Sequence, residues 1–395
     1  MALDISIGFS QDEVPEKAAQ IAALDAKKNL NSDGLNFAFV FSTVDYDPSV
    51  TLPVIYNTLQ GMPILGCSTA GLVQSTSIKT SGIAILTVHS NDIQCGTGHI
   101  ENINTFNPYQ AGSMLANNCI EKYGRHGRAI FLFFIDGLLA GNQQFTKGIQ
   151  DILGTVFPTV GIGSSDDFTY KDSFQIYQNR ILRNSATGLI LGGHLNVGIG
   201  NRHGWRPLGK PRIIDKVEGN IIKSISGYRA SYLYEEYLGD EALDLQTSKG
   251  DKMSILYPLG IFVEGNKEYL LRNALSIGDD GSIVCQGDVP EKAEVHLMIG
   301  NKETCKHAAF EAAQEAKNNL LGKQPKAILV FISFARLKLF GRTAFQEIEE
   351  IKKVFAPDVP IFGMYSNGEI CPFQSNERFK KALFQNCSIV VLAIS

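Results

Sequence analysis

Three short segments of the chain combine small residues with side chains that could bind a ligand. Each has the form Pro-x-x-Gly followed by a serine-bearing turn, and they begin at Pro63, Pro158 and Pro360. Such turns bring hydroxyls and backbone amides close to a bound molecule, because glycine and serine take up little space. The candidate ligand-binding residues of the first two segments are Cys67, Ser68, Thr69, Ser164 and Ser165, together with Asp136, which follows the apolar run before the second segment.

The third segment lies among charged and amide side chains that could recognise a zwitterion. Arg336 could bind a carboxylate through two parallel hydrogen bonds, and Glu369 could accept hydrogen bonds from an ammonium group. Tyr365, Ser366 and Asn386 would add hydrogen-bonding groups, so we expect a small-molecule pocket in the C-terminal part of the chain. The alternative is that Arg336 and Glu369 pair with each other and hold two strand ends together.

Cys67 lies between Gly66 and Ser68, which raises the alternative of an enzyme with a cysteine nucleophile. Such a cysteine needs a lowered pKa from a nearby histidine or a helix N-terminus. The sequence after Cys67 is typical of a loop and a strand, and the other two segments carry Ile162 and Met364 at the equivalent place. An apolar packing position accounts for all three residues. We therefore expect Cys67 to be buried and unreactive, and the protein not to be an enzyme.

Residues 161–167 allow two further interpretations. The amides of residues 161–165 could hold a phosphate, but the dinucleotide fingerprint needs a helix after its glycines, and residues 173–182 are typical of a strand. Asp166 and Asp167 could bind a cation or an amino group, or they could form a solvated turn. No two histidines stand two or four residues apart and no C-x-x-C pair is present, so we expect neither a metal nor a cofactor.

The three segments occupy the same place in a unit that recurs along the chain, at residues 37–88, 129–191 and 327–394. Each unit has an apolar strand, a helix, a short strand that ends in the Pro-x-x-Gly segment, and a last apolar strand. A helix precedes each unit, and residues 5–9 and 295–299 are typical of strands that lead into the first and third of these helices. Because an internal repeat decides the architecture, we expect three superposable units with the same strand order.

Residues 195–294 differ from these units. Apolar and polar side chains alternate between many turn residues, which is typical of β-hairpins, and residues 230–238 have the pattern of a short helix. Residues 205–212 have the proline and glycine content of a linker. We therefore predict an α/β fold with mixed β-sheets covered by helices, in two domains that comprise residues 1–208 and 209–395.

The composition argues against several classes of partner. Of the 395 residues 44% are hydrophobic, and a formal net charge of −4 gives no electrostatic basis for binding nucleic acid or an anionic membrane. No apolar run reaches the roughly 18–20 residues of a membrane span, and the N-terminus lacks the pattern of a signal peptide. The 7 scattered cysteines are typical of reduced thiols. These features predict a cytoplasmic protein.

At these motifs the chain resembles the FIST family, whose members are sensory modules of signal-transduction proteins. The resemblance covers nearly the whole length, as a FIST N domain in residues 1–208 and a FIST C domain in residues 209–395. The N part is carried by the sequences at residues 66–71, 134–137 and 160–167. The C part is carried by the sequences at residues 226–230, 257–260, 270–273, 287–290 and 363–370.

Two positions depart from the family pattern. Residues 333–336 lack the cysteine that usually precedes the arginine, and residues 385–388 begin with glutamine where histidine is common. The resemblance implies a cytoplasmic sensory protein that recognises a small polar metabolite, such as an amino acid. Because the two domains occupy the chain, it also implies output through a separate partner, such as a histidine kinase or another signalling protein. The alternatives are a protein-interaction adaptor without a small ligand and an enzyme that uses Cys67.

Overall fold

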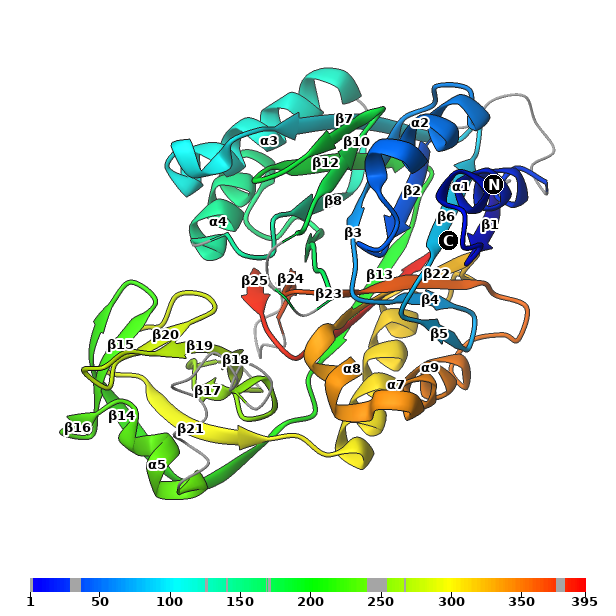
Figure 1. Cartoon of the computed structure of the whole chain (residues 1–395). Coiled ribbons are helices and arrows are strands. Elements are labelled where there is room, and N and C mark those ends of the chain that lie inside the picture. Colours follow the sequence, from blue (N-terminus) through cyan, green and yellow to red (C-terminus); the bar gives the residue numbers. More distant parts are fainter. Residues whose placement is uncertain are drawn as a thin grey trace.

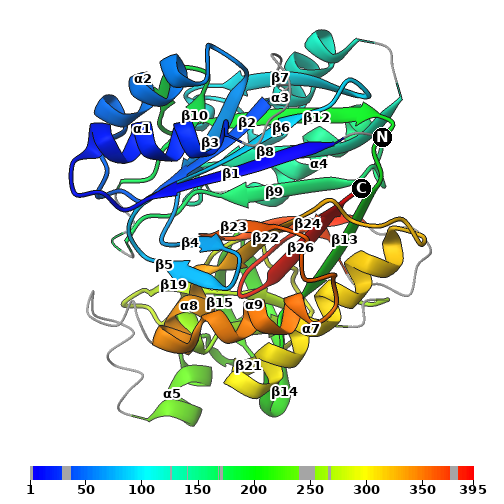
Figure 2. The same cartoon turned by 90° about the vertical axis from the view of Figure 1, so that its right-hand side faces the viewer.

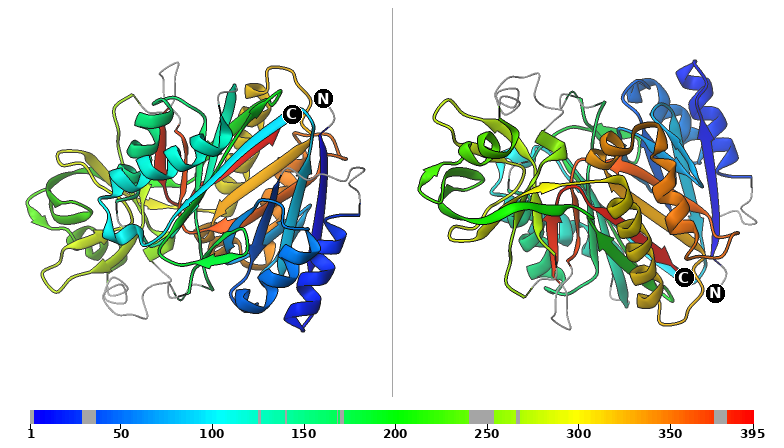
Figure 3. Two further views of the ribbon diagram at one scale, coloured as in Figure 1. Left: turned by 90° about the horizontal axis from the view of Figure 1, so that it is seen from above. Right: turned by 90° about the horizontal axis from the view of Figure 1, so that it is seen from below.

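Three β-sheets lie at the centre of the molecule with helices on their outer sides, and a fourth sheet forms a lobe beside them (Figures 1 and 3). This arrangement confirms the predicted α/β fold with mixed sheets covered by helices. The computed structural model describes residues 3–28, 37–124, 127–139, 141–167, 169, 172–239, 254–265, 268–373 and 381–395.

The chain builds three successive units. The first contains β1 (Asp4–Ser10), α1 (Pro15–Asp25), β2 (Phe37–Ser42), α2 (Pro48–Thr58), β3 (Ile64–Ser68), β4 (Leu72–Gln74), β5 (Ser77–Lys79) and β6 (Ile83–His89). The second contains β7 (Ile93–Ile100), α3 (Pro108–Tyr123), β8 (Arg128–Ile135), α4 (Asn142–Leu153), β9 (Thr159–Gly163), β10 (Gln175–Tyr177), β11 (Arg180–Leu182) and β12 (Ala186–Gly193). The third contains β13 (Val197–Arg202), α7 (Lys302–Asn319), β22 (Ala327–Ser333), α8 (Phe334–Phe340), α9 (Phe345–Lys352), β23 (Ile361–Ser366), β24 (Glu369–Pro372), β25 (Ala382–Gln385) and β26 (Ile389–Ile394).

The three units have the same strand order, which confirms the repeat. Their sheets read β1-β6-β2-β3, β7-β12-β8-β9 and β13-β26-β22-β23. In each sheet the last two strands of this order are parallel to each other and the other neighbours are antiparallel. The glycine of each Pro-x-x-Gly segment also has the same register, because Gly66, Gly161 and Gly363 lie opposite Val40, Phe133 and Val330.

The units also exchange hairpins in a closed cycle. The hairpin β4–β5 of the first unit pairs with β23 of the third, as Figure 2 shows. The hairpin β24–β25 of the third unit pairs with β9 of the second, and β10–β11 of the second pairs with β3 of the first. Each six-stranded sheet therefore gains its fifth and sixth strands from another unit, so the three units form one interlocked body.

The inner faces of the three sheets pack on one another to form the central core. Its aromatic centre is Phe41. The centroid of its ring lies 5.5 Å from the ring centroid of Phe134 and 5.2 Å from that of Phe362. The strands β2, β8 and β22 are buried on both faces, since helices cover their outer sides, and they therefore read as continuous apolar runs. This explains why strand positions in the units were predictable from the sequence.

The strand that leads into the third unit is β13, so the expectation that residues 295–299 take this place is wrong. Gly198 and Gly200 of β13 pack against α7 so closely that a Cβ would lie 1.9 Å from a carbonyl oxygen of that helix. Gly8 of β1 packs in the same way against α1. The chain leaves this contact after β13 and returns to it only at α7, because about a hundred residues are inserted between them.

The insertion forms the separate lobe seen in Figure 1 and has its own hydrophobic core. Its elements are β14 (Arg206–Glu218), β15 (Ile221–Ile225), β16 (Tyr228–Arg229), α5 (Tyr232–Leu238), β17 (Leu259–Ile261), β18 (Leu270–Arg272), β19 (Ala274–Ile277), β20 (Ile283–Cys285) and β21 (Glu294–Ile299). Residues 295–299 thus pair with β14 and β17 inside the lobe. The proposed domain boundary between residues 208 and 209 falls within β14.

Replacing Gly66 or Gly363 by alanine should lower the free energy of unfolding by about 1–3 kcal/mol, because the buried strands cannot separate to admit a methyl group. An added Cβ would lie 1.8 Å from the carbonyl oxygen of Val40 at the first position and 1.9 Å from that of Val330 at the second. Urea unfolding measures the loss. Gly127→Ala is the control, since nothing lies within 4 Å of its Cβ. Equal stabilities for all three variants would contradict the close approach of the strands.

Candidate functional site

The turns after the three Pro-x-x-Gly strands meet where the units join. Ser165 donates its backbone N–H to the carbonyl of Ser68 at 3.1 Å, and Asn367 donates to the carbonyl of Gly163 at 2.9 Å. At the third junction the hydroxyl of Ser165 lies between the chains: it accepts from the N–H of Ala70 at 2.9 Å and donates to the carbonyl of Tyr365 at 2.7 Å. The three turns therefore form a ring with nearly threefold symmetry. Ser165 breaks this symmetry, because its hydroxyl bridges the third junction, where the other two have a direct backbone hydrogen bond.

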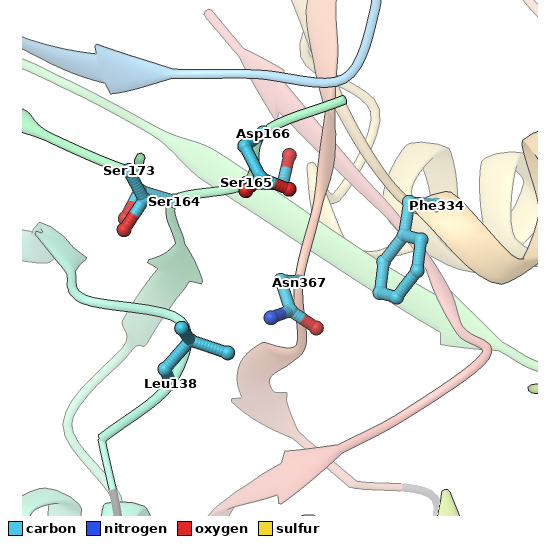
Figure 4. Close-up of a pocket in the computed structure, with 7 residues that line it drawn as sticks. All are labelled: Leu138, Ser164, Ser165, Asp166, Ser173, Phe334 and Asn367. Atoms are coloured by element: carbon cyan, nitrogen blue, oxygen red, sulfur yellow. The ribbon is translucent and has the colours of Figure 1, made fainter. Parts of the chain in front are cut away.

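A narrow pocket opens beside this ring, between the second and third units (Figure 4). The enclosed space is small, with room for about one water molecule behind an open mouth. Figure 4 shows Phe334 and Leu138 on either side of Asn367, with the serines and Asp166 across from them. The residues that line the pocket are Leu138, Ser164, Ser165, Asp166, Ser173, Phe334 and Asn367.

The polar groups of the pocket are held by contacts within the turns. Ser164 accepts a hydrogen bond from the side-chain amide of Gln175 at 2.8 Å, and Ser173 donates to Asp136 Oδ1 at 3.4 Å. Asp166 accepts from the hydroxyl of Thr169 at 2.8 Å through Oδ2 and is almost completely buried. These side chains are therefore held in place by the fold.

A buried network of amides connects the pocket with the inserted lobe. Asn367 Oδ1 accepts from the side chain of Gln286 at 2.8 Å. Gln286 Oε1 in turn accepts from Asn273 and from Asn386, at 3.0 Å each. All four side chains are buried. The predicted site residue Asn386 thus does not line the pocket and is connected to Asn367 of the pocket wall through Gln286.

Arg336 lies inside the protein and pairs with Glu347 of α9, so the alternative of a pair with Glu369 is wrong. Its side chain has no exposed surface, and Nε donates to Glu347 Oε1 at 2.8 Å. Its other nitrogens donate to the carbonyls of His203, Cys305 and Cys387. The guanidinium therefore joins four segments of the third unit and does not line the pocket.

The other predicted residues of the third segment are also buried. Glu369 accepts from the hydroxyls of Ser366 at 2.5 Å and Ser388 at 2.6 Å, and burial raises its pKa to about 8. Tyr365 is fully buried, and its hydroxyl has no hydrogen-bond partner within the described ranges. These side chains stabilise the strand ends behind the pocket wall.

Cys67 is buried in the central core, as predicted, and burial raises the pKa of its thiol well above the ordinary value. Its Sγ lies 3.6 Å from Sδ of Met364, the residue at the equivalent place in the third unit. Ser68 accepts from the backbone N–H of Phe174 at 3.0 Å, and Thr69 donates to the carbonyl of Tyr365 at 2.7 Å. Neither side chain lines the pocket.

The amides that a phosphate would need are already used. The N–H groups of Gly163, Ser164 and Ser165 donate to carbonyls of residues 368, 135 and 68, at 2.9, 2.8 and 3.1 Å. A phosphate would have to compete with the hydrogen bonds that join the units. The described turn is therefore a junction between units.

Four pocket residues were not among the sequence candidates, and the reasons differ. Asn367 belongs to the segment at residues 363–370, whose tyrosine, serine and glutamate were preferred to it. Phe334 and Leu138 are apolar, so they carry no chemical signal. Ser173 was assigned to a strand, whereas it lies in the loop before β10. Only the folded arrangement brings these four together.

Comparison with protein families accounts for the two halves of the chain. A model of the FIST N domain matches residues 36–228, and a model of the FIST C domain matches residues 230–372.

The chain belongs to the FIST family.

FIST domains are sensory domains of signal transduction. Within this FIST protein the two matched regions share sheets, because β4 and β9 of the first pair with β23 and β24 of the second. Among the described helices, none combines the length and the apolar character needed to span a membrane. In the described ranges, no group of three or more His, Cys, Asp or Glu side chains is placed to hold a metal ion.

Related sequences come from distant organisms. An uncharacterised protein of Mycobacterium tuberculosis is 21% identical over 375 residues, which cover 93% of this chain and 94% of that protein. One from Methanocaldococcus jannaschii is 26% identical over 257 residues, 60% of this chain, and the match spans only about half (48%) of that protein. A cyanuric acid hydrolase from A. caulinodans aligns over 99% of both chains with 8% identity and a TM-score of 0.40, which does not establish a shared fold.

Proposed function

We propose that this FIST protein is a cytoplasmic sensor that binds a small polar metabolite in the pocket between the second and third units and signals through a separate partner protein. The observation that supports this location is convergence: hydroxyls, a carboxylate and an amide from two units meet an aromatic ring in one pocket. Fixed polar groups beside apolar side chains are typical of small-molecule sites. We propose a binding role and not a catalytic one, since Cys67 lies in the core.

The amide network offers a route from the pocket to the rest of the molecule. A ligand that contacts Asn367 alters the environment of Gln286, which belongs to the inserted lobe. A ligand shifts a conformational equilibrium only through contacts that differ between two states, and Asn367 is positioned to provide such a contact. We propose that a shift of the lobe against the units is what a partner, such as a histidine kinase, detects.

Replacing Leu138 by tryptophan should abolish ligand binding with little loss of stability. Leu138 is 46% exposed at the pocket, so a larger ring there fills the pocket and does not strain the core. The measurement is a thermal-shift screen of the unaltered chain against small metabolites, amino acids included. A ligand at a hundred times its Kd stabilises by about 2.7 kcal/mol.

The matched control for this variant is Leu275→Trp, since Leu275 is 40% exposed on the inserted lobe and outside the pocket. We expect each stabilising compound to lose its effect on the Leu138 variant and to keep it on the control. Compounds that stabilise both variants equally would show that the protein binds them elsewhere.

A further inference from the structure

A second, larger groove lies between the first and third units. It is open, has a volume of about 800 Å³, and separates the hairpin β4–β5 from the helices α8 and α9 (Figures 1 and 2). Ile78 of β5 belongs to one wall, and Leu337, Arg342 and Phe345 belong to the other. No described residue lines both this groove and the pocket beside the ring of turns. The groove is therefore a separate surface of the molecule.

One wall of the groove is the free edge of a sheet, since β5 is the last strand of its sheet. In the neighbouring strand β4, the carbonyl of Gly71 accepts from Tyr365 and the N–H of Ser75 donates to β23, so every second residue bonds to β23. Val73 is one of these, and it therefore makes no backbone hydrogen bond to Ile78, the residue opposite on β5. The N–H and C=O of Ile78 consequently point to the free edge.

The repeat supplies equivalent edges for comparison. Ile181 of β11 and Phe384 of β25 occupy the place of Ile78 in the hairpins of the other two units. In the third unit the outward groups are used, because the N–H of Phe384 donates to Gln143 Oε1 at 3.2 Å and its carbonyl accepts from Arg272 Nη1 at 3.0 Å. Within the described ranges the backbone groups of Ile78 have no such partner. The edge of β5 can therefore bond to a further strand.

The charge around this edge is positive. Arg342 is exposed in the wall of the groove, and Lys79 belongs to β5. Lys302 lies at the same turn as Arg342, since its Nζ donates to the carbonyl of Phe340 at 3.1 Å and to Oγ1 of Thr343 at 3.0 Å. In the described part of the chain none of these three cations forms an ion pair, and no Asp or Glu lines the groove. A partner therefore meets positive charge here, although the chain has a formal net charge of −4.

We propose that the edge of β5 is a docking site for an extended, acidic segment of a partner protein, which adds to the sheet as a further strand. The backbone of this segment bonds to Ile78, as in other complexes in which a peptide extends a sheet. Its apolar side chains contact Phe345, which is 38% exposed, and its acidic side chains bind the guanidinium of Arg342. The proposal goes beyond the proposed function, because docking here needs no ligand in the pocket.

The test measures the binding of a fluorescein-labelled hexapeptide, in which valine and aspartate alternate, by fluorescence anisotropy. We expect the unaltered chain to bind it. Two altered peptides should bind at least about tenfold more weakly. One has lysine in place of aspartate, so its charge has the same sign as that of Arg342. The other has every backbone nitrogen methylated, so it cannot donate to the carbonyl of Ile78. Absence of binding, or equal affinity for the methylated peptide, would overturn the proposal.

Two variants of the protein test the same contacts from the other side. Ile78→Pro removes the N–H at the free edge, where a strand accepts proline because this N–H is not bonded to β4. Ile181→Pro is the matched control at the equivalent place of β11. Arg342→Glu reverses a charge, and Arg206→Glu does so at an exposed position of the inserted lobe. Ile78→Pro and Arg342→Glu should each weaken binding of the acidic peptide by about tenfold or more, and both controls should leave it unchanged.

Arg342→Glu keeps the proposal testable if Ile78→Pro does not fold, because Arg342 is exposed. This variant should also bind the lysine peptide more tightly than the unaltered chain does. Unchanged binding of both peptides to it, or equal losses in a variant and its control, would contradict docking at β5. Such a result leaves the proposed function standing, because Leu138→Trp tests the pocket independently.

Discussion

Replacing Arg336 by methionine should lower the free energy of unfolding by about 3–5 kcal/mol, the usual cost of breaking a buried ion pair. The substitution leaves Glu347 without its partner in a site that neither side chain exposes to solvent. It also removes the donors for the carbonyls of His203, Cys305 and Cys387. Urea unfolding monitored by circular dichroism measures the change.

Two further variants separate the ion pair from general effects of mutation. In Arg336→Met combined with Glu347→Leu no charge is left unpaired, so the double variant should be more stable than the single one. Arg183→Ala breaks an ion pair with Asp172 in which both side chains are more than half exposed, and it should cost at most about 1 kcal/mol. The role assigned to Arg336 would be wrong if its loss cost no more than that of Arg183.

Glu369→Gln should remove part of the pH dependence of the free energy of unfolding. Burial raises the pKa of Glu369 to about 8 in the folded protein from an ordinary value of 4.5. Between these values the folded state binds a proton that the unfolded state lacks. The contribution of Glu369 to stability is therefore fully present below pH 4.5 and is lost as the pH rises through 8. The loss is a few kcal/mol, since one pKa unit corresponds to about 1.4 kcal/mol. A neutral glutamine avoids it.

The measurement is urea unfolding of both proteins between pH 5 and pH 9. We expect the difference in stability to move in favour of the glutamine variant as the pH rises. The difference isolates Glu369, because Glu268, with its pKa raised to about 7 by burial, and His203, with its pKa lowered to about 3 by burial, titrate in both proteins. Glu349→Gln, at an exposed position, is the control. Parallel curves for the wild type and the Glu369 variant would refute the burial argument.

The sequence predicted what is local and missed what depends on how the units dock. The apolar runs of β2, β8 and β22 indicated strands because each is buried on both faces. The leading strand of the third unit was assigned wrongly, since the insertion moves β13 far from α7 along the chain while the two remain in contact. No pattern in a single sequence shows that a strand packs against a helix about a hundred residues away and not against the next element along the chain.

The candidate site illustrates the same limit. Ser164 and Ser165 were predicted because their turn is composed of small residues, and they do line a pocket. The partner of Arg336 could not be chosen in advance, because Glu347 is one of three glutamates within four residues of α9 and only the helix orientation places it inside. Phe334 and Leu138 complete the pocket through shape, which has no signature in a single sequence.

The cyclic exchange of hairpins has a consequence for how the chain folds. Cys67 and Met364 touch although 297 residues separate them, and the hairpin β4–β5 finds its partner strand only when β23 exists. Contacts between residues so far apart in the sequence slow folding, because a long loop must close before they form. Until the third unit has been synthesised, the first two units therefore expose unpaired strand edges, and such edges promote aggregation. The exchange makes the three units one cooperative folding unit, and the sheets are complete only when the strands of the third unit have paired.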